Sequence, residues 1–236
     1  SSSNITDVVI LDGATSIDGS AFEGYGGLTN VVIPNSVTNI DGRAFYGCRG
    51  LTDVTIPACV LEKGFRNVFS SSGSITNVVI QDGLTDIVDD AFSGCSRLRR
   101  VTIPNSVTRI GAGAFYGCSG LTSVTIPSSV TNIGDRAFEY CSGLTDVTIP
   151  DSVTSIGRSA FSSCSGLTDV TLPACVLEQG IRNVFGWSSG IKSVVISDRV
   201  TNIGRRAFDG CYRLTKVVIP NSVTNVGEYA FSGCSS

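Results

Sequence analysis

The segment Leu121–Gly143 reads LTSVTIPSSVTNIGDRAFEYCSG, and the segment that follows it, from Leu144, reads LTDVTIPDSVTSIGRSAFSSCSG. The same phrase recurs along the whole chain of 236 residues. Self-similarity at a fixed period of about 20–50 residues is typical of solenoids, so we expect one solenoid domain over residues 1–236. Ten repeats of 23 or 24 residues begin at Ile5, Leu28, Leu51, Ile75, Leu98, Leu121, Leu144, Leu167, Ile191 and Leu214.

Two repeats are one residue longer than the others and share an unusual sequence. The repeat from Leu51 contains PACVLEKGFRNVF, and the repeat from Leu167 contains PACVLEQGIRNVF. Their starts lie 116 residues apart, which is the length of five repeats. Residues 5–120 and 121–236 therefore read as two copies of a five-repeat block, each with one irregular repeat in its middle.

Each regular repeat predicts a short strand, a second extended piece and one helical turn. Valine occupies the fourth position of all ten repeats, within an alternating apolar pattern typical of a strand. All seven prolines occupy the seventh position, where the missing N–H ends a strand. After the extended piece Val130–Ile133, Gly134 favours a turn. Ala137, Phe138 and Cys141 are spaced to share one side of a helical turn.

One such repeat has no partner for its apolar face, whereas stacked repeats bury a continuous core. Strands stack about 4.8 Å apart, so ten coils predict a rod or arc about 48 Å long. Each large buried apolar side chain contributes about 1.5–3 kcal/mol. We expect the core to be centred on one phenylalanine per repeat, namely Phe22, Phe45, Phe69, Phe92, Phe115, Phe138, Phe161, Phe185, Phe208 and Phe231.

The composition excludes several classes of protein. Hydrophobic residues make up 42% of the chain and charged residues 16%, which favours a packed core over disorder. The net charge of -3 argues against nucleic acid as a partner, and the absence of a long apolar run argues against membrane insertion. The chain contains no histidine, which excludes hydrolase triads built on that residue. We therefore expect no enzyme activity and no cofactor.

The nine cysteines predict a row of buried thiols rather than a metal site. No CxxC spacing is present, so zinc-type ligation is not expected. Cys59 and Cys175 belong to the irregular repeats. Parallel side chains in stacked coils disfavour disulfides, and the pairs to examine for one are Cys48 with Cys59 and Cys164 with Cys175, which recur in both five-repeat blocks. The other cysteines share the twenty-first position of the repeat: Cys48, Cys95, Cys118, Cys141, Cys164, Cys211 and Cys234.

The phrase LTxVTIPxSVTxIGxxAFxxCSG resembles the BspA-like, or Treponema-type, leucine-rich repeat family over essentially all of residues 5–236. The resemblance implies a right-handed leucine-rich repeat solenoid of the α/β type, with the LTxVTIP strands forming a concave parallel sheet. It also implies a secreted or cell-surface protein, bacterial in most members, with a role in adhesion and without catalytic residues. The departures from the phrase are Leu51–Ser74 and Leu167–Gly190, where local bulges are expected.

The outward-facing strand positions are the candidate binding surface, because their side chains vary while the frame stays fixed. Trp187, in the tail of the second irregular repeat, is a further candidate; its counterpart is Ser71, and a packing role for Trp187 stays open. The third position contributes Asp53, Asn77, Arg100, Ser123, Asp146, Asp169, Ser193 and Lys216, and the fifth contributes Thr102, Thr125 and Thr148.

Basic residues cluster in two places and allow two interpretations. They are either solvated surface charges or sites for an anionic glycan or an acidic partner. The clusters are Arg97, Arg99 and Arg100 in one case and Arg205, Arg206 and Arg213 in the other.

These features favour a non-catalytic module that binds a protein or a glycan on the concave face of an extracellular or cell-surface protein. The alternative is a structural spacer or array-forming segment of a larger surface protein. The last repeat is close to consensus and lacks the polar cap that solenoids normally need. It therefore predicts either end-to-end self-association or a continuation of the solenoid.

Overall fold

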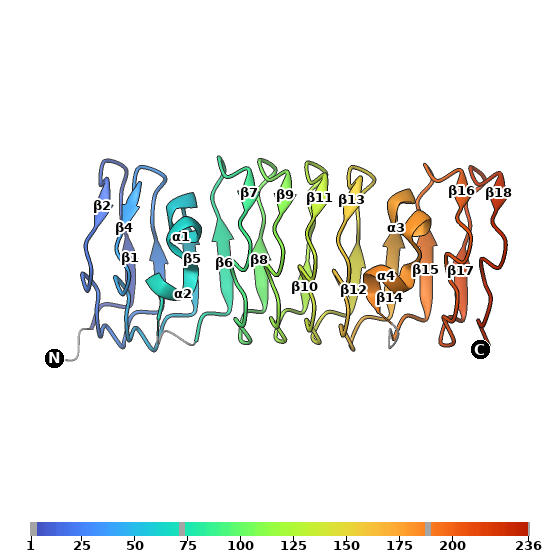
Figure 1. The fold of residues 1–236 in the computed structure, drawn as a ribbon. Coiled ribbons are helices and arrows are strands. Elements are labelled where there is room, and N and C mark those ends of the chain that lie inside the picture. Colours follow the sequence, from blue (N-terminus) through green and yellow to red (C-terminus); the bar gives the residue numbers. More distant parts are fainter. Residues whose placement is uncertain (1–3, 71–73, 187–189, 236) are drawn as a thin grey trace.

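The computed structural model describes residues 4–70, 74–186 and 190–235. In this part of the chain ten parallel strands stand side by side along a rod, one from each repeat (Figure 1). The predicted solenoid of leucine-rich type is thereby confirmed. The strands are β1 (Asp7–Val9), β3 (Asn30–Val32), β5 (Asp53–Ile56), β6 (Asn77–Ile80), β8 (Arg100–Thr102), β10 (Ser123–Val124), β12 (Asp146–Thr148), β14 (Asp169–Leu172), β15 (Ser193–Ile196) and β17 (Lys216–Val218).

Within each of two sheets these strands pair in register with the next, so equivalent positions of the repeat form rows. Val31, for example, pairs with Val54, and Val54 with Val78. The hydrogen-bonded ladder is divided into a six-stranded sheet, β1 to β10, and a four-stranded sheet, β12 to β17. The division follows β10, which has two residues where the other nine strands have three or four.

A second set of short strands follows the proline position and runs along another side of the rod (Figure 1). Their partners are again the equivalent strands of neighbouring coils, as in the pairing of Ile110 with Ile133. The set comprises β2 (Ser16–Ile17), β4 (Asn39–Ile40), β7 (Asp86–Ile87), β9 (Arg109–Ile110), β11 (Asn132–Ile133), β13 (Ser155–Ile156), β16 (Asn202–Ile203) and β18 (Asn225–Val226).

The segment expected to form a helical turn is a series of tight turns in the regular coils. The N–H of Cys141 donates to the carbonyl of Phe138, three residues earlier, at 3.2 Å. The N–H of Phe138, however, donates to Ala160 of the next coil at 2.7 Å. Arg136 and Tyr140 have φ angles of 56° and 62°, which interrupt helical geometry. Hydrogen bonding between coils therefore replaces part of the hydrogen bonding within a helix.

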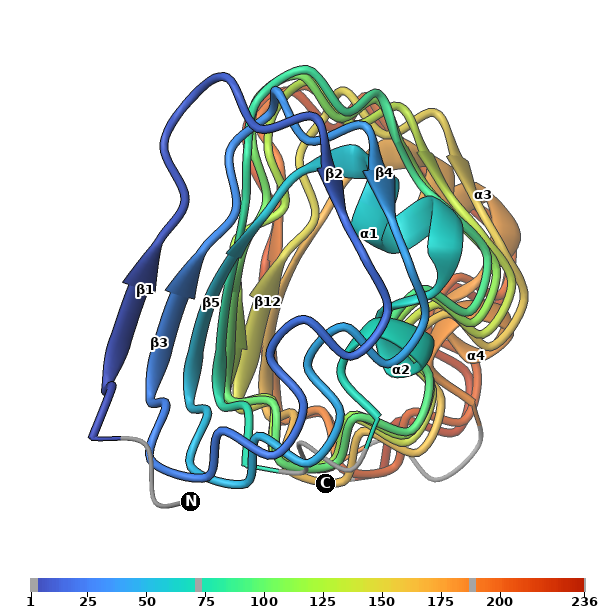
Figure 2. The ribbon, with the colours of Figure 1, turned by 90° about the vertical axis from the view of Figure 1, so that its left-hand side faces the viewer.

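Helices form only in the two irregular repeats of the described chain: α1 (Ala58–Lys63) and α2 (Phe65–Val68), then α3 (Ala174–Gln179) and α4 (Ile181–Phe185). Gly64 and Gly180, with φ angles of 95° and 86°, separate the helices of each pair. Seen along the rod, the helices lie on the side opposite β1, β3 and β5 (Figure 2). Successive coils are displaced relative to one another, so they do not superpose when the molecule is viewed along the rod (Figure 2).

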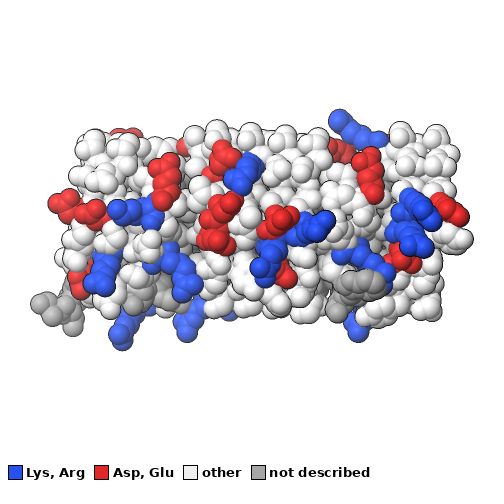
Figure 3. All heavy atoms as spheres, in the orientation of Figure 1, with Lys and Arg blue, Asp and Glu red and all other residues white. Residues whose placement is uncertain are grey.

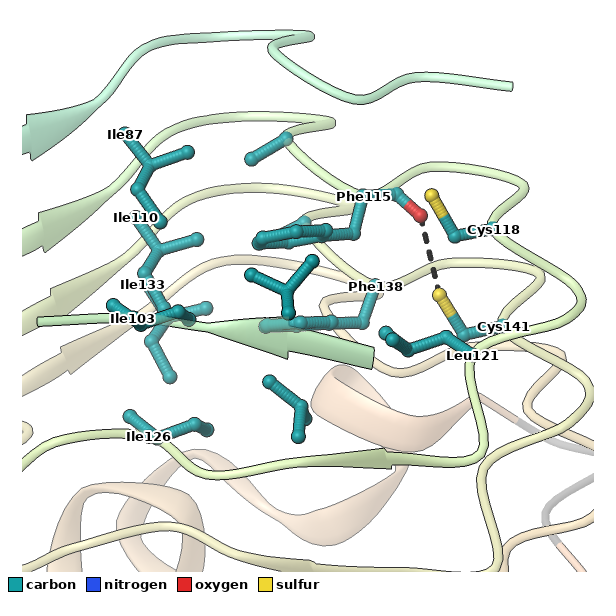
Figure 4. Close-up of a cluster of buried hydrophobic side chains, with 14 of the residues drawn as sticks. Ile87, Ile103, Ile110, Phe115, Cys118, Leu121, Ile126, Ile133, Phe138 and Cys141 are labelled. Atoms are coloured by element: carbon teal, nitrogen blue, oxygen red, sulfur yellow. Dashed lines mark hydrogen bonds between the residues drawn. The ribbon is translucent and has the colours of Figure 1, made fainter. Parts of the chain in front are cut away.

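The core contains the predicted row of phenylalanines, which we call the Phe stack. Phe138 lies between Phe115 and Phe161, with ring centroids 5.0 and 4.9 Å away and nearly parallel planes (Figure 4). The stack changes at the first irregular repeat. There Phe65 of α2 is inserted, at 4.9 Å from Phe69 and 5.0 Å from Phe92.

All nine cysteines are free, and six of them are buried. The predicted row of buried thiols is therefore present, and the two disulfides considered from the sequence are not. Where one regular coil follows another, the thiol donates to the carbonyl of the phenylalanine in the preceding coil, as Cys141 does to Phe115 at 3.1 Å (Figure 4). Cys48 donates to Phe22 and Cys59 to Val37, so these two thiols have separate partners.

Candidate functional site

The candidate surface is the outward side of the ten principal strands, which we call the sheet face. Side chains alternate between core and solvent along each strand, as the exposed–buried–exposed pattern of β8 and β12 shows. The third position of the repeat begins every strand, and the fifth lies two residues further on the same side. All the strand positions predicted from the sequence therefore share one face.

The third positions form a continuous polar row whose two halves differ. Near the N-terminus the row is hydrogen-bonded to itself, because Asn30 donates to Asp7 at 3.3 Å and Asn77 donates to Asp53 at 2.7 Å. From Arg100 onward most members are exposed and face solvent: Arg100, Ser123, Asp146, Asp169 and Lys216, with Ser193 half-buried. The predicted candidates Asp53 and Asn77 are therefore already engaged with each other.

The exposed half of the polar row carries charges of both signs. Arg100 and Lys216 lie toward its ends, and Asp146 and Asp169 lie between them in register on β12 and β14. The two carboxylates belong to strands about 4.8 Å apart, a separation that one cationic group can bridge. Each also accepts a hydrogen bond from the threonine before it, Thr145 at 3.0 Å and Thr168 at 2.7 Å. These bonds orient the carboxylates without neutralising them.

The fifth positions form a second row of valine and threonine. The predicted residues Thr102, Thr125 and Thr148 are exposed in its centre. Val79 and Val195 flank them and are 42% and 41% exposed, well above the core valines. These two valines were not among the candidate site residues predicted from the sequence. Their place at the fifth position of the repeat is the signal that could have identified them. That position faces outward, whereas the valines at the fourth position face the core.

Trp187 lies outside the described residues. The cysteine thiols are poor candidates for nucleophiles, because burial raises the pKa of Cys95 to about 11 and that of Cys164 to about 12. Within the described ranges, no group of three or more histidine, cysteine, aspartate or glutamate side chains is arranged to hold a metal ion. No helix of that part of the chain has the length and apolar character needed to cross a membrane.

Comparison with known proteins places the sequence in a repeat family. The model of the BspA type leucine rich repeat region matches residues 1–121, 63–181 and 181–236. No curated protein matches the chain.

Several solved structures are similar to it. A leucine-rich repeat protein from Bacteroides ovatus is 24% identical, with 97% of this chain and 72% of that chain covered and a TM-score of 0.43. A leucine rich cell surface protein from Faecalibacterium prausnitzii is 28% identical, with 99% and 86% covered and a TM-score of 0.42. The leucine rich repeat protein of T. pallidum is 24% identical, with 98% and 77% covered and a TM-score of 0.30.

Proposed function

Because this chain belongs to the BspA-type leucine-rich repeat family, we propose that it is a non-catalytic binding or adhesion module. We place it in an extracellular or cell-surface protein, with a protein ligand on the sheet face. The single observation that supports this most directly is the pair of outward rows, polar and valine–threonine, which run in register along the strands β1 to β10 and again along β12 to β17. A glycan ligand of the same face is the alternative occupant.

The charges of the polar row favour a protein ligand of defined sign. A basic side chain fits between Asp146 and Asp169, with acidic groups of the ligand near Arg100 and Lys216. The exposed valines supply apolar contact beside these charges. The six principal strands from β8 to β17, which carry these residues, span roughly 24 Å at about 4.8 Å per strand.

A spacer function is the second candidate, and one observation favours it for the N-terminal strands. There Asn30 and Asn77 direct their amide groups to Asp7 and Asp53 rather than to solvent. Such hydrogen bonds strengthen the stack and leave little for a ligand. We therefore place the ligand on the strands from β8 to β17.

The test of the sheet face is a double substitution, Asp146→Asn with Asp169→Asn, which removes two charges and keeps the shape. Purified extracellular-matrix proteins and glycans are titrated by surface plasmon resonance. We expect at least tenfold weaker binding of the partner, because breaking buried ion pairs at an interface costs about 2–5 kcal/mol. The matched control is Asp12→Asn with Asp198→Asn, two exposed carboxylates outside the sheet-face rows. Equal affinity of both double variants would contradict the proposal.

A further inference from the structure

A hollow of about 620 Å³ lies beside α2, where the first irregular repeat returns to the sheet. The core residues Phe65 and Phe69 contribute to its apolar lining, and Arg49, Arg66 and Arg97 line it from three separate coils. We call it the arginine hollow. Figure 3 shows several basic side chains around the lower edge of the rod in the N-terminal half. The hollow thus combines apolar contact with positive charge.

The positive charge of the hollow is not neutralised by the protein. Within the described ranges no acidic residue lines it, and none of the three arginines forms an ion pair. Arg66 donates to the carbonyl of Ser93 at 3.4 Å, a long hydrogen bond that leaves most of its donors available. In a chain of net charge -3, this concentration of cationic groups favours an anionic ligand.

The position of Arg66 depends on the bare backbone of Gly94. A Cβ atom at Gly94 would lie 2.9 Å from Nη1 of Arg66, and the φ angle of Gly94 is 72°. The guanidinium therefore packs against the next coil instead of extending freely into solvent. A donor group held in place loses less conformational entropy when it binds a ligand.

The second irregular repeat and the coil after it show the same frame with less positive charge. Arg182 stands 116 residues after Arg66, and it pairs with Asp209 at 3.4 Å. Asp209 corresponds to Ser93. Arg49 is likewise replaced by Ser165 and Ser96 by Tyr212. The coil therefore folds without Arg49 and with a carboxylate beside the central arginine, so stability does not explain the arginine hollow.

We propose that the arginine hollow is a second binding site, which takes an anionic saccharide bearing carboxylate or sulfate groups. The guanidinium groups bind the oxyanions through charge-assisted hydrogen bonds. The hydroxyls of Ser70, Ser74 and Ser96, which also line the hollow, are suited to the sugar hydroxyls. This site is separate from the sheet face and does not depend on the function proposed for it.

The backbone around the hollow favours a saccharide over an extended acidic peptide. The N–H of Gly47 donates to Ser70 at 3.2 Å, and the N–H of Gly94 donates to Tyr116 at 2.7 Å. These groups are paired between coils and are not available to add a strand. A peptide bound in extended form needs such main-chain partners, whereas a saccharide is bound by side chains.

The test is a calorimetric titration of the protein with three probes in separate experiments: a heparin-derived tetrasaccharide, a hyaluronan tetrasaccharide and a neutral chitin tetrasaccharide. We expect saturable binding of at least one anionic probe and none of the neutral probe. Sulfate and carboxylate specificity are separated by the first two probes. The substitution Ser93→Asp, which copies Asp209 beside Arg182, should weaken binding by about tenfold or more. Arg97→Gln should have a similar effect.

The matched control is Arg213→Gln, the counterpart of Arg97→Gln in the coil that follows the second irregular repeat. Melting temperatures of all variants confirm that they fold. The proposal is overturned if no anionic saccharide binds, or if Arg213→Gln weakens binding as much as Arg97→Gln. It is also overturned if Ser93→Asp folds and binds as the wild type does. Tighter binding of an oligoglutamate peptide, with the same dependence on Ser93→Asp, would assign the hollow to a protein ligand instead.

Discussion

The substitution Phe138→Ala tests whether the Phe stack holds the solenoid together. The ring of Phe138 is fully buried and lies between two other rings, at 5.0 Å from Phe115 and 4.9 Å from Phe161. Its carbonyl also accepts the thiol of Cys164 at 3.1 Å, a contact that the substitution leaves in place. The variant therefore removes ring packing without removing the backbone ladder between coils.

The expected loss in free energy of unfolding is about 3–5 kcal/mol, because truncation of a buried phenylalanine leaves a cavity. Within that loss, each stacked ring pair accounts for about 0.5–1.5 kcal/mol. Phe22→Ala is the matched control. Phe22 is half-buried in the first coil and stacks on Phe45 alone, so we expect about 1–2 kcal/mol there.

Urea unfolding followed by circular dichroism measures both variants, fitted with a nearest-neighbour model because long repeat arrays depart from two-state behaviour. A double-mutant cycle with Phe115→Ala should give a coupling energy of about 0.5–1.5 kcal/mol. Equal losses for Phe138→Ala and Phe22→Ala would refute the reasoning. So would a coupling energy indistinguishable from zero between Phe115 and Phe138.

Three further predictions concern backbone and thiols. Ser163 has a φ of 59°, a left-handed conformation that its counterpart Gly47 adopts at 73° without a Cβ penalty. Ser163→Gly should therefore raise the free energy of unfolding by about 0.5–1 kcal/mol in urea titrations, and a decrease would contradict this. Gly134→Ala should lower it by more than about 2 kcal/mol, because the new Cβ would lie 2.5 Å from the backbone nitrogen of Ala112; a near-neutral result would show that the coils separate easily. Burial raises the pKa of the Cys164 thiol to about 12, whereas a thiol in the unfolded chain has a pKa of about 8.5. As the pH rises above about 8.5, the unfolded state loses this proton first, so the free energy of unfolding falls. Melting temperatures between about pH 8 and pH 10 should fall less steeply for Cys164→Ala than for the wild type.

The repeat and its strands could be predicted from the sequence, because valine at the fourth position and proline at the seventh mark the same strand ten times. The buried thiols followed from the same period. The turn after Gly134 could not be predicted in detail. The spacing of Ala137, Phe138 and Cys141 suits a helical turn, but the N–H of Phe138 finds a carbonyl in the next coil. A local pattern does not reveal a partner more than twenty residues away.

The candidate surface shows the same limit. Sequence position identified which side chains point outward, including Asp53 and Asp146, which occupy the same place in the repeat. Their surroundings differ because Asn77 donates to Asp53, whereas Asp146 lies beside a second carboxylate, Asp169. The neighbour in the next coil therefore decides whether an outward residue is engaged or available. That neighbour becomes visible only once the register is known.

The internal similarity of the two irregular repeats separates what the coil requires from what a ligand would require. Residues that the frame needs are the same in both, such as Phe69 and Phe185 in the stack. Arg66 and Arg182 are also equivalent, yet the residue beside each of them differs. Arg66 donates to the carbonyl of Ser93, whereas Arg182 forms an ion pair with Asp209. If charge at this place served only folding, a carboxylate would be expected in both repeats. The difference therefore marks the arginine hollow as a feature that folding alone does not account for.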